Sequence, residues 1–452
     1  MLKQEQGPGD GKQVLTPDVL VIGGGPAGST AATLLARRGW QVLMLEKDVH
    51  PRFHIGESLL PMNLPILERL GVIDQVREIG VRKAGADFTV ADSDTETHVF
   101  RFTGGLGLPR DHAFQVRRSE FDQLLFEHAR ANGVDARDGV RVKTIALGAD
   151  GRPEKFQATA ADGAKFSVRP RYVVDASGRD TFLGNKLKLK RKSNKHQSAA
   201  IFSHFRGVER RPGEDAGNVT VDRFEHGWYW LIPLRDDIMS VGAVCSPEYL
   251  KQRRSDNETF LMQTLNARGS VARRMRGAER VAPVHATGNY SYGCTRMSGP
   301  GWVMAGDAYA FIDPVFSSGV LLAMLSAEQA SEVVDGALRE PARERALQKA
   351  MEKRFRRGLK HFSWFIHRFT SPVMKRLFSA PRNDFQLQQA VVSMLAGDVF
   401  DNPAVIRRLY IFRALYALNA IAIAPQALAG WREHRRRVRA KFSGDTLQEG
   451  NP

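Results

Sequence analysis

The sequence predicts an α/β fold, and three observations support this prediction. Between residues 18 and 46, an apolar run, a glycine-rich turn, a helical pattern and a second apolar run follow one another, which is the order of a βαβ unit. Much of residues 80–290 instead shows short, strand-like alternation, which is typical of antiparallel sheets. After about residue 335 the pattern becomes helical and basic. We therefore expect a Rossmann-type parallel sheet, an inserted and mostly antiparallel sheet domain, and a helical C-terminal region.

The expected domain boundaries follow from these changes of pattern. Residues 1–17 are polar and predict a disordered leader. A discontinuous nucleotide-binding module covers residues 18–335, with the inserted sheet domain at about 80–110 and 190–290. Residues 336–452 form the helical, basic region. The length of 452 residues and the hydrophobic fraction of 42% suit two or three domains with a real core.

The cysteine usage and the apolar runs predict a cytoplasmic protein. The chain has only two cysteines, Cys245 and Cys294, which make neither a disulfide framework nor a metal-ligand spacing, so no metal is expected. The leader lacks the apolar run of a secretory signal. The longest apolar stretch, Ala414–Ala424, is too short to span a bilayer.

The formal net charge is +17, and basic residues gather at Lys186–Lys195, Lys353–Lys360 and Arg432–Lys441. Such runs can simply be solvated surface. A nucleic-acid partner is not expected, because no recognition motif accompanies the charge. An acidic protein partner or an anionic membrane surface fits better, and peripheral membrane contact is the less favoured of the two.

The first βαβ unit carries a dinucleotide fingerprint. The strand Asp18–Gly23 leads through Gly23-x-Gly25-x-x-Gly28 into the helix Ala27–Arg38, and Trp40–Glu46 is the next strand. The glycines allow a tight turn, close approach of a pyrophosphate and close helix packing, and the helix start receives the phosphate charge. A carboxylate at the end of the second strand can accept from ribose hydroxyls. The residues expected to bind the dinucleotide here are Gly23, Gly25, Pro26, Ala27, Gly28, Glu46 and Lys47.

Two later motifs favour FAD over NAD. Asp175-Ala176-Ser177-Gly178 follows the buried-strand run Tyr172–Asp175, and Gly306-Asp307-Ala308 follows the run Trp302–Ala305. These segments resemble the FAD-dependent aromatic hydroxylases and halogenases of the p-hydroxybenzoate hydroxylase fold. The resemblance implies that Asp307 binds the flavin ribityl chain and that Asp175 and Gly306 belong to the cofactor site. The segment Gln115–Asp122 resembles the flavin-contacting segment of the same family, with Arg118 at its arginine position.

Three further segments resemble the flavin-dependent halogenases in particular. The first is Gly227–Pro233, which contains Trp-x-Trp-x-Ile-Pro. The resemblance implies that bulky residues keep the substrate apart from the flavin, although an aromatic strand in a sheet core would look similar. The residues concerned are Trp228, Trp230, Ile232 and Pro233.

The second segment is Phe311–Gly319, which precedes an apolar helical pattern. Pro314 and Gly319 take cofactor-site positions of the family. A helix start offers free N–H groups to an anion, so the N–H groups of Ser318 and Gly319 could hold a halide. Contact with the flavin pyrimidine alone, as in hydroxylases, stays open.

The third segment is Pro51–Pro61, which ends in Gly56-Glu57-Ser58-Leu59-Leu60-Pro61 and resembles halogenases that act on phenols and pyrroles. Some prenyl-chain reductases carry a similar segment. Lys83, which we expect at the start of a strand, takes the position of their catalytic lysine. Burial can lower the pKa of a lysine enough to make the amine nucleophilic. A counterpart of the glutamate that tryptophan halogenases use as a second catalytic residue is not identifiable.

The resemblance implies a halogenase that uses FADH2 from a separate flavin reductase, oxygen, and chloride or bromide. Hypohalous acid forms beside the flavin and reaches Lys83, which presents the halogen to an electron-rich phenol or pyrrole. An acyl carrier protein that holds the substrate would be an acidic partner for the basic chain. Two alternatives stay open at this point: an FAD-dependent aromatic hydroxylase, and a prenyl-lipid reductase that sits on a membrane.

Overall fold

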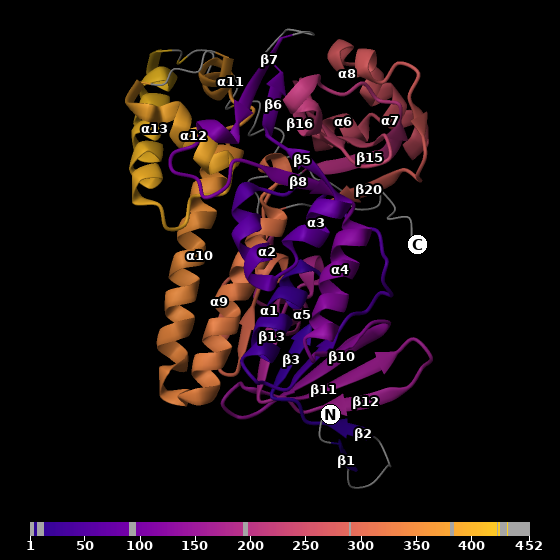
Figure 1. Cartoon of the computed structure of the whole chain (residues 1–452), viewed down its shortest axis with the longest axis vertical. Coiled ribbons are helices and arrows are strands. Elements are labelled where there is room, and N and C mark those ends of the chain that lie inside the picture. Colours follow the sequence, from indigo (N-terminus) through magenta and orange to yellow (C-terminus); the bar gives the residue numbers. More distant parts are fainter. Residues whose placement is uncertain are drawn as a thin grey trace.

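The computed structural model describes residues 4–6, 13–89, 96–192, 198–288, 291–379 and 384–422, together with the single positions 424 and 432. A nucleotide-binding part forms the lower half of the molecule in Figure 1, and an antiparallel sheet with short helices lies above it. The last helices stand beside both parts. The α/β fold class predicted from the sequence is confirmed.

The central sheet of the nucleotide-binding part has six strands. All neighbours in it are parallel except the first pair, β22 and β23. The apolar runs that predicted its strands are fully buried, as expected for a parallel sheet covered on both faces. In spatial order the strands are β22 (Ser298–Gly299), β23 (Trp302–Met304), β13 (Tyr172–Asp175), β3 (Val19–Ile22), β4 (Val42–Leu45) and β9 (Asp135–Arg137).

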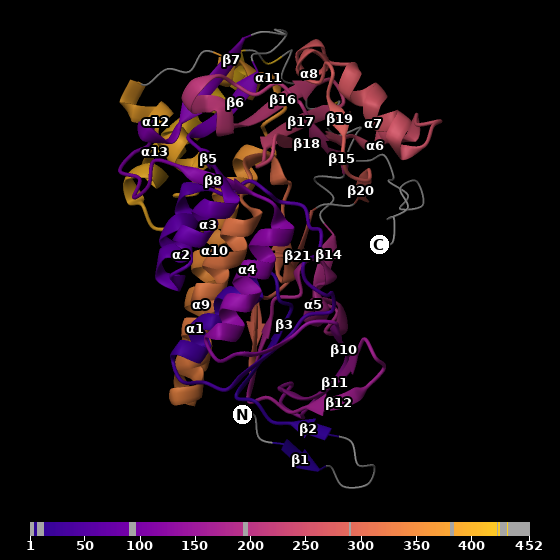
Figure 2. The same cartoon turned by 45° about the vertical axis from the view of Figure 1, so that its right-hand side comes forward.

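The second large sheet forms the upper part of the molecule in Figures 1 and 2. It is antiparallel except where β16 runs parallel to β6, and β20 (His285–Gly288) pairs with β15 outside the main path. In spatial order the strands are β19 (Glu279–Arg280), β15 (Ala199–Arg206), β18 (Ile238–Cys245), β17 (Gly227–Pro233), β16 (Val219–Phe224), β6 (Gly85–Thr89) and β7 (Thr97–Arg101).

Part of the predicted leader belongs to the fold, which corrects the expectation of disorder over residues 1–17. The strand β2 (Gln13–Leu15) pairs in parallel with β12 (Lys165–Val168), and the side chains of Val14 and Leu15 are buried. Two apolar residues in a row are enough to anchor a strand when a partner edge lies beside it. The rest of this sheet is β1 (Gln4–Gln6), β11 (Pro153–Ala160) and β10 (Val140–Leu147).

Two small sheets lie near the junction of the two parts. One contains β14 (Lys190–Lys192), β21 (Tyr292–Cys294) and β24 (Ala310–Phe311). The other pairs β5 (Gly80–Lys83) with β8 (Ala113–Val116). Lys83 is therefore the last residue of one strand rather than the start of the next, because the chain leaves the β5–β8 pair at Ala84 and enters the larger sheet at Gly85.

The long helices cover the parallel sheet and extend past it. Helix α1 (Pro26–Arg37) packs against α4 (Arg118–Ala131) and α9 (Gly319–Arg339), and α10 (Glu344–Ile366) packs on α9. No helix within the described ranges is long and apolar enough to cross a membrane. The remaining helices are α2 (Leu64–Leu70), α3 (Ile73–Ile79), α5 (Phe182–Lys186), α6 (Pro247–Lys251), α7 (Asn257–Asn266), α8 (Gly269–Arg274), α11 (Pro372–Ser379), α12 (Leu387–Leu395) and α13 (Pro403–Ala422).

Candidate functional site

A large cavity lies between the parallel sheet and the antiparallel sheet. Its volume is about 1450 Å³, against roughly 300–1,000 Å³ for ordinary ligand pockets. Twelve of the residues expected at the site line this cavity, and they come from both sheets. They are Gly23, Gly25, Pro26, Ala27, Glu46, Lys47, Arg118, Trp228, Trp230, Ile232, Asp307 and Gly319.

The glycine turn has the shape that a pyrophosphate site requires. Gly23 adopts a φ of +103°, and a Cβ on Gly28 would lie 1.8 Å from the Gly23 carbonyl oxygen. Only glycine fits at these two positions. A Cβ on Gly25 would meet nothing closer than Arg52, at 3.5 Å. The backbone at Gly25 is therefore open to a ligand, whereas Gly28 serves the packing of α1 and does not line the cavity.

Glu46 at the end of β4 is buried and bound to the glycine turn. Its Oε2 accepts a hydrogen bond from the Gly24 N–H at 2.7 Å, and its Oε1 accepts one from the Asp48 N–H at 3.0 Å. Each carboxylate oxygen can accept a second hydrogen bond, which leaves capacity for ribose hydroxyls. Lys47, next along the chain, is partly exposed and pairs with Asp180 at 2.7 Å.

Arg118 lies in a buried ionic cluster that the sequence did not reveal in full. It donates to both Asp122 oxygens, at 2.7 and 2.9 Å, and Arg52 donates to the same carboxylate at 3.2 Å. Burial alone would raise the pKa of Asp122, but the contacts with Arg118 and Arg52 outweigh it and the pKa is lowered.

Arg52 lines the cavity beside Gly25 and is a candidate phosphate ligand that sequence reasoning missed. In the sequence, the one indication of this role is that Arg52 lies between the glycine turn and the Glu57–Pro61 segment.

The three residues of the later flavin motifs have different surroundings. Asp307 lines the cavity, and burial raises its pKa to about 6 against the opposing effect of Arg179 and Arg118. Asp175 does not line the cavity. Its carboxylate instead accepts hydrogen bonds from the N–H groups of Ser177 and Leu183. Gly306 also lies behind the wall, and its N–H donates to Ser326 Oγ. We conclude that Asp175 and Gly306 shape the loops of the site.

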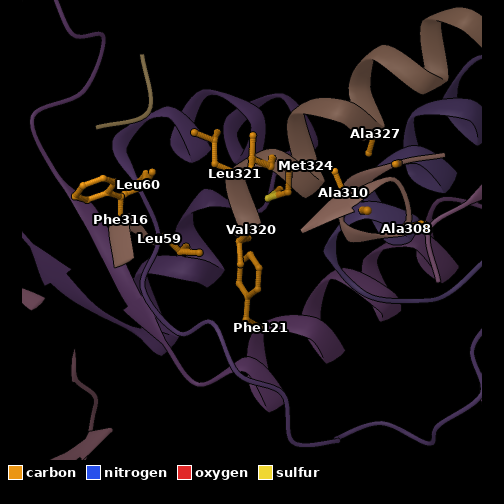
Figure 3. Packing of buried hydrophobic residues seen from close by; sticks show 14 of the residues in the cluster. Leu59, Leu60, Phe121, Ala308, Ala310, Phe316, Val320, Leu321, Met324 and Ala327 are labelled. Atoms are coloured by element: carbon orange, nitrogen blue, oxygen red, sulfur yellow. The ribbon is translucent and has the colours of Figure 1, made fainter. Parts of the chain in front are cut away.

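The start of α9 is held firmly against the chain around Leu59. Figure 3 shows Phe316, Val320 and Leu321 packed close to Leu59 and Leu60. Ser318 is buried behind the cavity wall, whereas Gly319 lines the cavity and a Cβ there would meet nothing within 4 Å. Of the two expected halide ligands, only Gly319 is therefore a lining residue.

The aromatic strand β17 forms one wall of the cavity. Trp228, Trp230 and Ile232 alternate along the strand and line the cavity, because alternate residues share one face of a sheet. The two indole rings lie 5.9 Å apart, and Trp230 Nε1 donates to Ser240 Oγ. Pro233 has the opposite parity and does not line the cavity, which corrects its expected role in separating substrate from flavin.

Lys83 is fully buried against the Glu57–Pro61 segment. Its Nζ donates to Ser58 Oγ at 2.9 Å and to the Leu59 carbonyl at 3.0 Å, and it lies 5.5 Å from the centre of the Phe102 ring. Burial lowers the pKa of Lys83 to about 7, and Asp87 opposes the shift. Lys83 itself does not line the cavity, but Ser58 does.

Asp87 is a second buried group near Lys83 that sequence reasoning did not single out. Its Oδ1 accepts from Asn218 Nδ2 at 2.9 Å, and burial raises its pKa to about 6.

The residues present fit an FAD molecule. The open backbone at Gly25, the Arg52 and Arg118 cations and the carboxylates of Glu46 and Asp307 line one continuous cavity. These groups complement a diphosphate between two polyhydroxyl chains. The size of the cavity also suits a dinucleotide rather than a small ligand.

Comparison with known proteins gives the same assignment. Residues 16–363 match the family model described as "FAD binding domain". A 1H-pyrrole-2-carbonyl-(peptidyl-carrier protein) chlorinase from Pseudomonas fluorescens is 32% identical over 406 residues, which cover 85% of this chain and 89% of the relative.

Solved structures agree with the sequence relatives. A flavoprotein/dehydrogenase from Cytophaga hutchinsonii superposes with a TM-score of 0.81 at 27% identity, covering 90% of this chain and 99% of that one. The flavin-dependent brominase Bmp2 superposes with a TM-score of 0.78 at 27% identity, covering 88% and 99%. With its FAD-binding cavity and these relatives, the chain belongs to the flavin-dependent halogenases of the FAD-binding domain family.

Proposed function

We propose that this protein uses reduced FAD, oxygen and a halide to halogenate an electron-rich aromatic ring, a phenol or a pyrrole, by way of hypohalous acid and Lys83. The observation that carries the proposal is the placement of Lys83. Its buried amine donates a hydrogen bond to Ser58 Oγ. Ser58 lines the same cavity as the residues of the flavin motifs. A lysine that only solvated the surface would not be buried in this way.

The protein part of the mechanism begins with the cofactor. When bound, reduced FAD supplies the electrons that activate oxygen. Arg52, Arg118 and the open backbone at Gly25 would hold its diphosphate, while Glu46 and Asp307 accept from its hydroxyl groups. Only one glycine-rich βαβ unit is present in the sequence, so we propose that a separate flavin reductase supplies the reduced cofactor.

The halide would lie at the start of α9. Gly319 lines the cavity with open space beside its Cα, and the first N–H groups of a helix attract anions. Ser318, the preceding residue, is buried. We propose that the Gly319 N–H contacts the chloride or bromide ion and that Ser318 contributes through its backbone.

Lys83 then handles the activated halogen. At neutral pH its pKa of about 7 leaves both protonation forms populated. The ammonium can donate a hydrogen bond to hypohalous acid, and the free amine can accept the halogen as a nucleophile. Trp228 and Trp230 stand in the cavity wall and would keep the aromatic substrate away from the flavin.

The substrate is proposed to be tethered to an acidic acyl carrier protein. The chlorinase relative has a name that specifies a pyrrole-carbonyl group on a peptidyl-carrier protein. One of the two expected docking segments is Lys186–Lys195, and its residues Lys186, Lys190 and Lys192 line the cavity. A carrier protein bound to this segment would hold its arm beside the site. The other segment, Arg432–Lys441, lies outside the described residues except for position 432.

Product analysis tests the proposal. The protein is mixed with FAD, a flavin reductase, NADH and either chloride or bromide, together with phenolic and pyrrolic acids that are free or carrier-bound. We expect mass spectrometry to show one halogen in place of one hydrogen, and only when halide is present. An added oxygen atom instead would identify a hydroxylase.

Charge reversal tests the carrier part of the proposal. Lys186→Glu with Lys192→Glu should slow association with the carrier and weaken its dependence on salt, because charge steering is screened over roughly 10 Å at 0.1 M salt. The control pair is Lys349→Glu with Lys353→Glu on α10, which changes the net charge of the protein by the same amount as the test pair. Equal halogenation of free and carrier-bound acid would contradict the tethered substrate.

A further inference from the structure

Lys83 lies where the chain crosses from the β5–β8 pair into the larger antiparallel sheet (Figure 1). It pairs with Ala113 as the last residue of β5, and β6 begins at Gly85. An ammonium carries three N–H donors, and two of those on Lys83 are bonded to Ser58 Oγ and the Leu59 carbonyl. One direction is left for the activated halogen. That direction depends on how firmly the chain is held on either side of Lys83.

Asn218 holds the chain just after Lys83. Its side chain is fully buried, and its Oδ1 accepts a hydrogen bond from the Gly85 N–H at 2.6 Å. The residue before it, Gly217, packs against the chain just before Lys83, because a Cβ on Gly217 would lie 1.8 Å from the Arg82 carbonyl oxygen. Positions 217 and 218 therefore contact the backbone on both sides of Lys83.

Hydrogen bonds fix the orientation of the Asn218 amide. Its Nδ2 donates to Asp87 Oδ1 at 2.9 Å and to Asp215 Oδ1 at 3.1 Å. The amide nitrogen can only donate and the amide oxygen can only accept, so the oxygen must face the Gly85 N–H. Arg101 holds Asp215 in turn through two hydrogen bonds, at 3.1 and 2.7 Å. Asn218 is thus anchored on the side away from Gly85.

Gln115 connects the same loop to the hydrogen-bond partner of Lys83. Its Nε2 donates to the Gly217 carbonyl at 3.0 Å, and its backbone forms an antiparallel bridge with Ser58. Ser58 accepts the hydrogen bond from Lys83 Nζ. The loop that ends at position 218 is therefore linked both to the chain that carries the amine and to the segment that receives its hydrogen bond.

We propose that Asn218 is a positioning residue for halogen transfer, and that its amide fixes the backbone at Gly85 so that the Lys83 amine keeps one direction. In the transfer step the oxygen–halogen bond of hypohalous acid breaks and a carbon–halogen bond forms, and the displaced ring proton leaves with hydroxide as water. Asn218 does not line the flavin cavity and acts through Lys83. This inference rests on the halogenase function proposed above.

The test separates formation of hypobromous acid from its transfer. Asn218→Ala is loaded with reduced FAD and mixed with oxygen, bromide and the aromatic substrate, while a parallel sample contains a halogen-accepting diketone. Both products are counted per bound FAD, so that loss of folded protein does not enter. We expect trapped hypobromous acid at the wild-type level and brominated aromatic product lowered by roughly 10-fold to 10²-fold, because a displacement of about 1 Å can cost that much.

A double-mutant comparison shows whether Asn218 acts through Lys83. Residues that act as one unit have non-additive effects, so Asn218→Ala should cause no further loss of transfer in a Lys83→Ala background. Gln348→Ala is the control, because it also removes a buried amide, which donates to Tyr172 Oη and to the Gly299 carbonyl, both at 2.8 Å. Gln348→Ala should lower the melting temperature and leave the transfer per bound FAD unchanged.

Arg101→Gln keeps the inference testable if Asn218→Ala does not fold. The Arg101 side chain is half exposed, so the fold should tolerate its replacement, while Asp215 loses its ionic partner. We expect a severalfold loss of transfer with normal formation of hypobromous acid.

Two results overturn the inference. One is wild-type transfer by Asn218→Ala or, if that variant does not fold, by Arg101→Gln. The other is an equal loss from Asn218→Ala in the wild-type and Lys83→Ala backgrounds. If the unaltered protein forms no hypobromous acid, the proposed function itself fails, and this outcome is recognised in the wild-type sample alone.

Discussion

The Lys83 Nζ lies 2.9 Å from Ser58 Oγ, and this hydrogen bond joins two segments that are 25 positions apart in the chain. Ser58 belongs to the wall of the FAD cavity, whereas Lys83 stands behind it. The lysine is thus close to the place where oxygen would be activated without being exposed to the flavin itself. This arrangement suits a group that acts after hypohalous acid has formed.

Burial of Lys83 should make the stability of the apoprotein depend on pH. Because the native pKa of about 7 lies below the usual 10.5, the unfolded state binds the extra proton between these values, and stability rises with pH across this window. Lys83→Met should therefore be stabilised most relative to wild type at or below pH 7, and the advantage should shrink toward pH 10.5. The total change should be several kcal/mol, at about 1.4 kcal/mol per pKa unit. Denaturant unfolding at several pH values measures it, and a pH-independent difference would contradict the lowered pKa.

Gly28→Ala should abolish FAD binding and destabilise the fold. The new Cβ would lie 1.8 Å from the Gly23 carbonyl oxygen, so either α1 or the glycine turn must move, at a cost of about 1–3 kcal/mol. Thermal unfolding and FAD titration measure the two effects. Gly104→Ala is the control, because nothing lies within 4 Å of a Cβ there, and it should leave both quantities unchanged. Normal FAD affinity in Gly28→Ala would argue against the fingerprint.

Gly319→Ala should affect the halide more than the cofactor. The position has open space for a methyl group, so the fold should tolerate the change, but the methyl would stand in the cavity where the halide is proposed to lie. We expect a KM for bromide at least severalfold higher and an unchanged affinity for FAD. An unchanged KM for both chloride and bromide would move the halide site elsewhere.

Trp230→Ala should open the wall between the flavin and the substrate. We expect part of the product to be hydroxylated rather than halogenated, measured as an added oxygen atom by mass spectrometry. Tyr229→Phe is the matched control, because Tyr229 lies on the opposite face of β17 and bonds to the Thr264 carbonyl. Exclusive halogenation by Trp230→Ala would show that the wall does not separate the two groups.

The sequence predicted best what depends on local pattern. The strand β3 is an unbroken apolar run, β13 is apolar up to its last residue, Asp175, and both strands are completely buried. The glycine turn lies between a strand and a helix as expected. The strand β2 was missed because it has three residues and pairs with β12, which lies far along the chain. No local signal could reveal that partner.

The sequence motifs predicted which segments form the site, but not the hydrogen-bond partners of the residues in it. Asp175 matched a family position, yet two backbone N–H groups occupy its carboxylate. The Glu57–His204 pair joins positions 147 residues apart. The hydrogen bonds of Asp175 depend on the local fold of the loop after β13, with partners two and eight residues further along the chain. The Glu57–His204 pair depends on how distant segments pack, so it does not follow from spacing. Because side chains alternate between the two faces of a strand, the sequence alone could have shown that Pro233 lies on the face opposite to Trp228, Trp230 and Ile232. The role expected for Pro233 did not take this alternation into account.

The most direct test of the central claim compares two outputs of Lys83→Ala in one experiment. The variant is loaded with reduced FAD and mixed with oxygen, bromide and the preferred aromatic substrate, while a parallel sample contains a halogen-accepting diketone. We expect FAD affinity and trapped hypobromous acid at wild-type levels, together with loss of the halogenated aromatic product by roughly 10²-fold or more, as for removal of a catalytic group. Wild-type amounts of halogenated product from Lys83→Ala would contradict the assignment of Lys83.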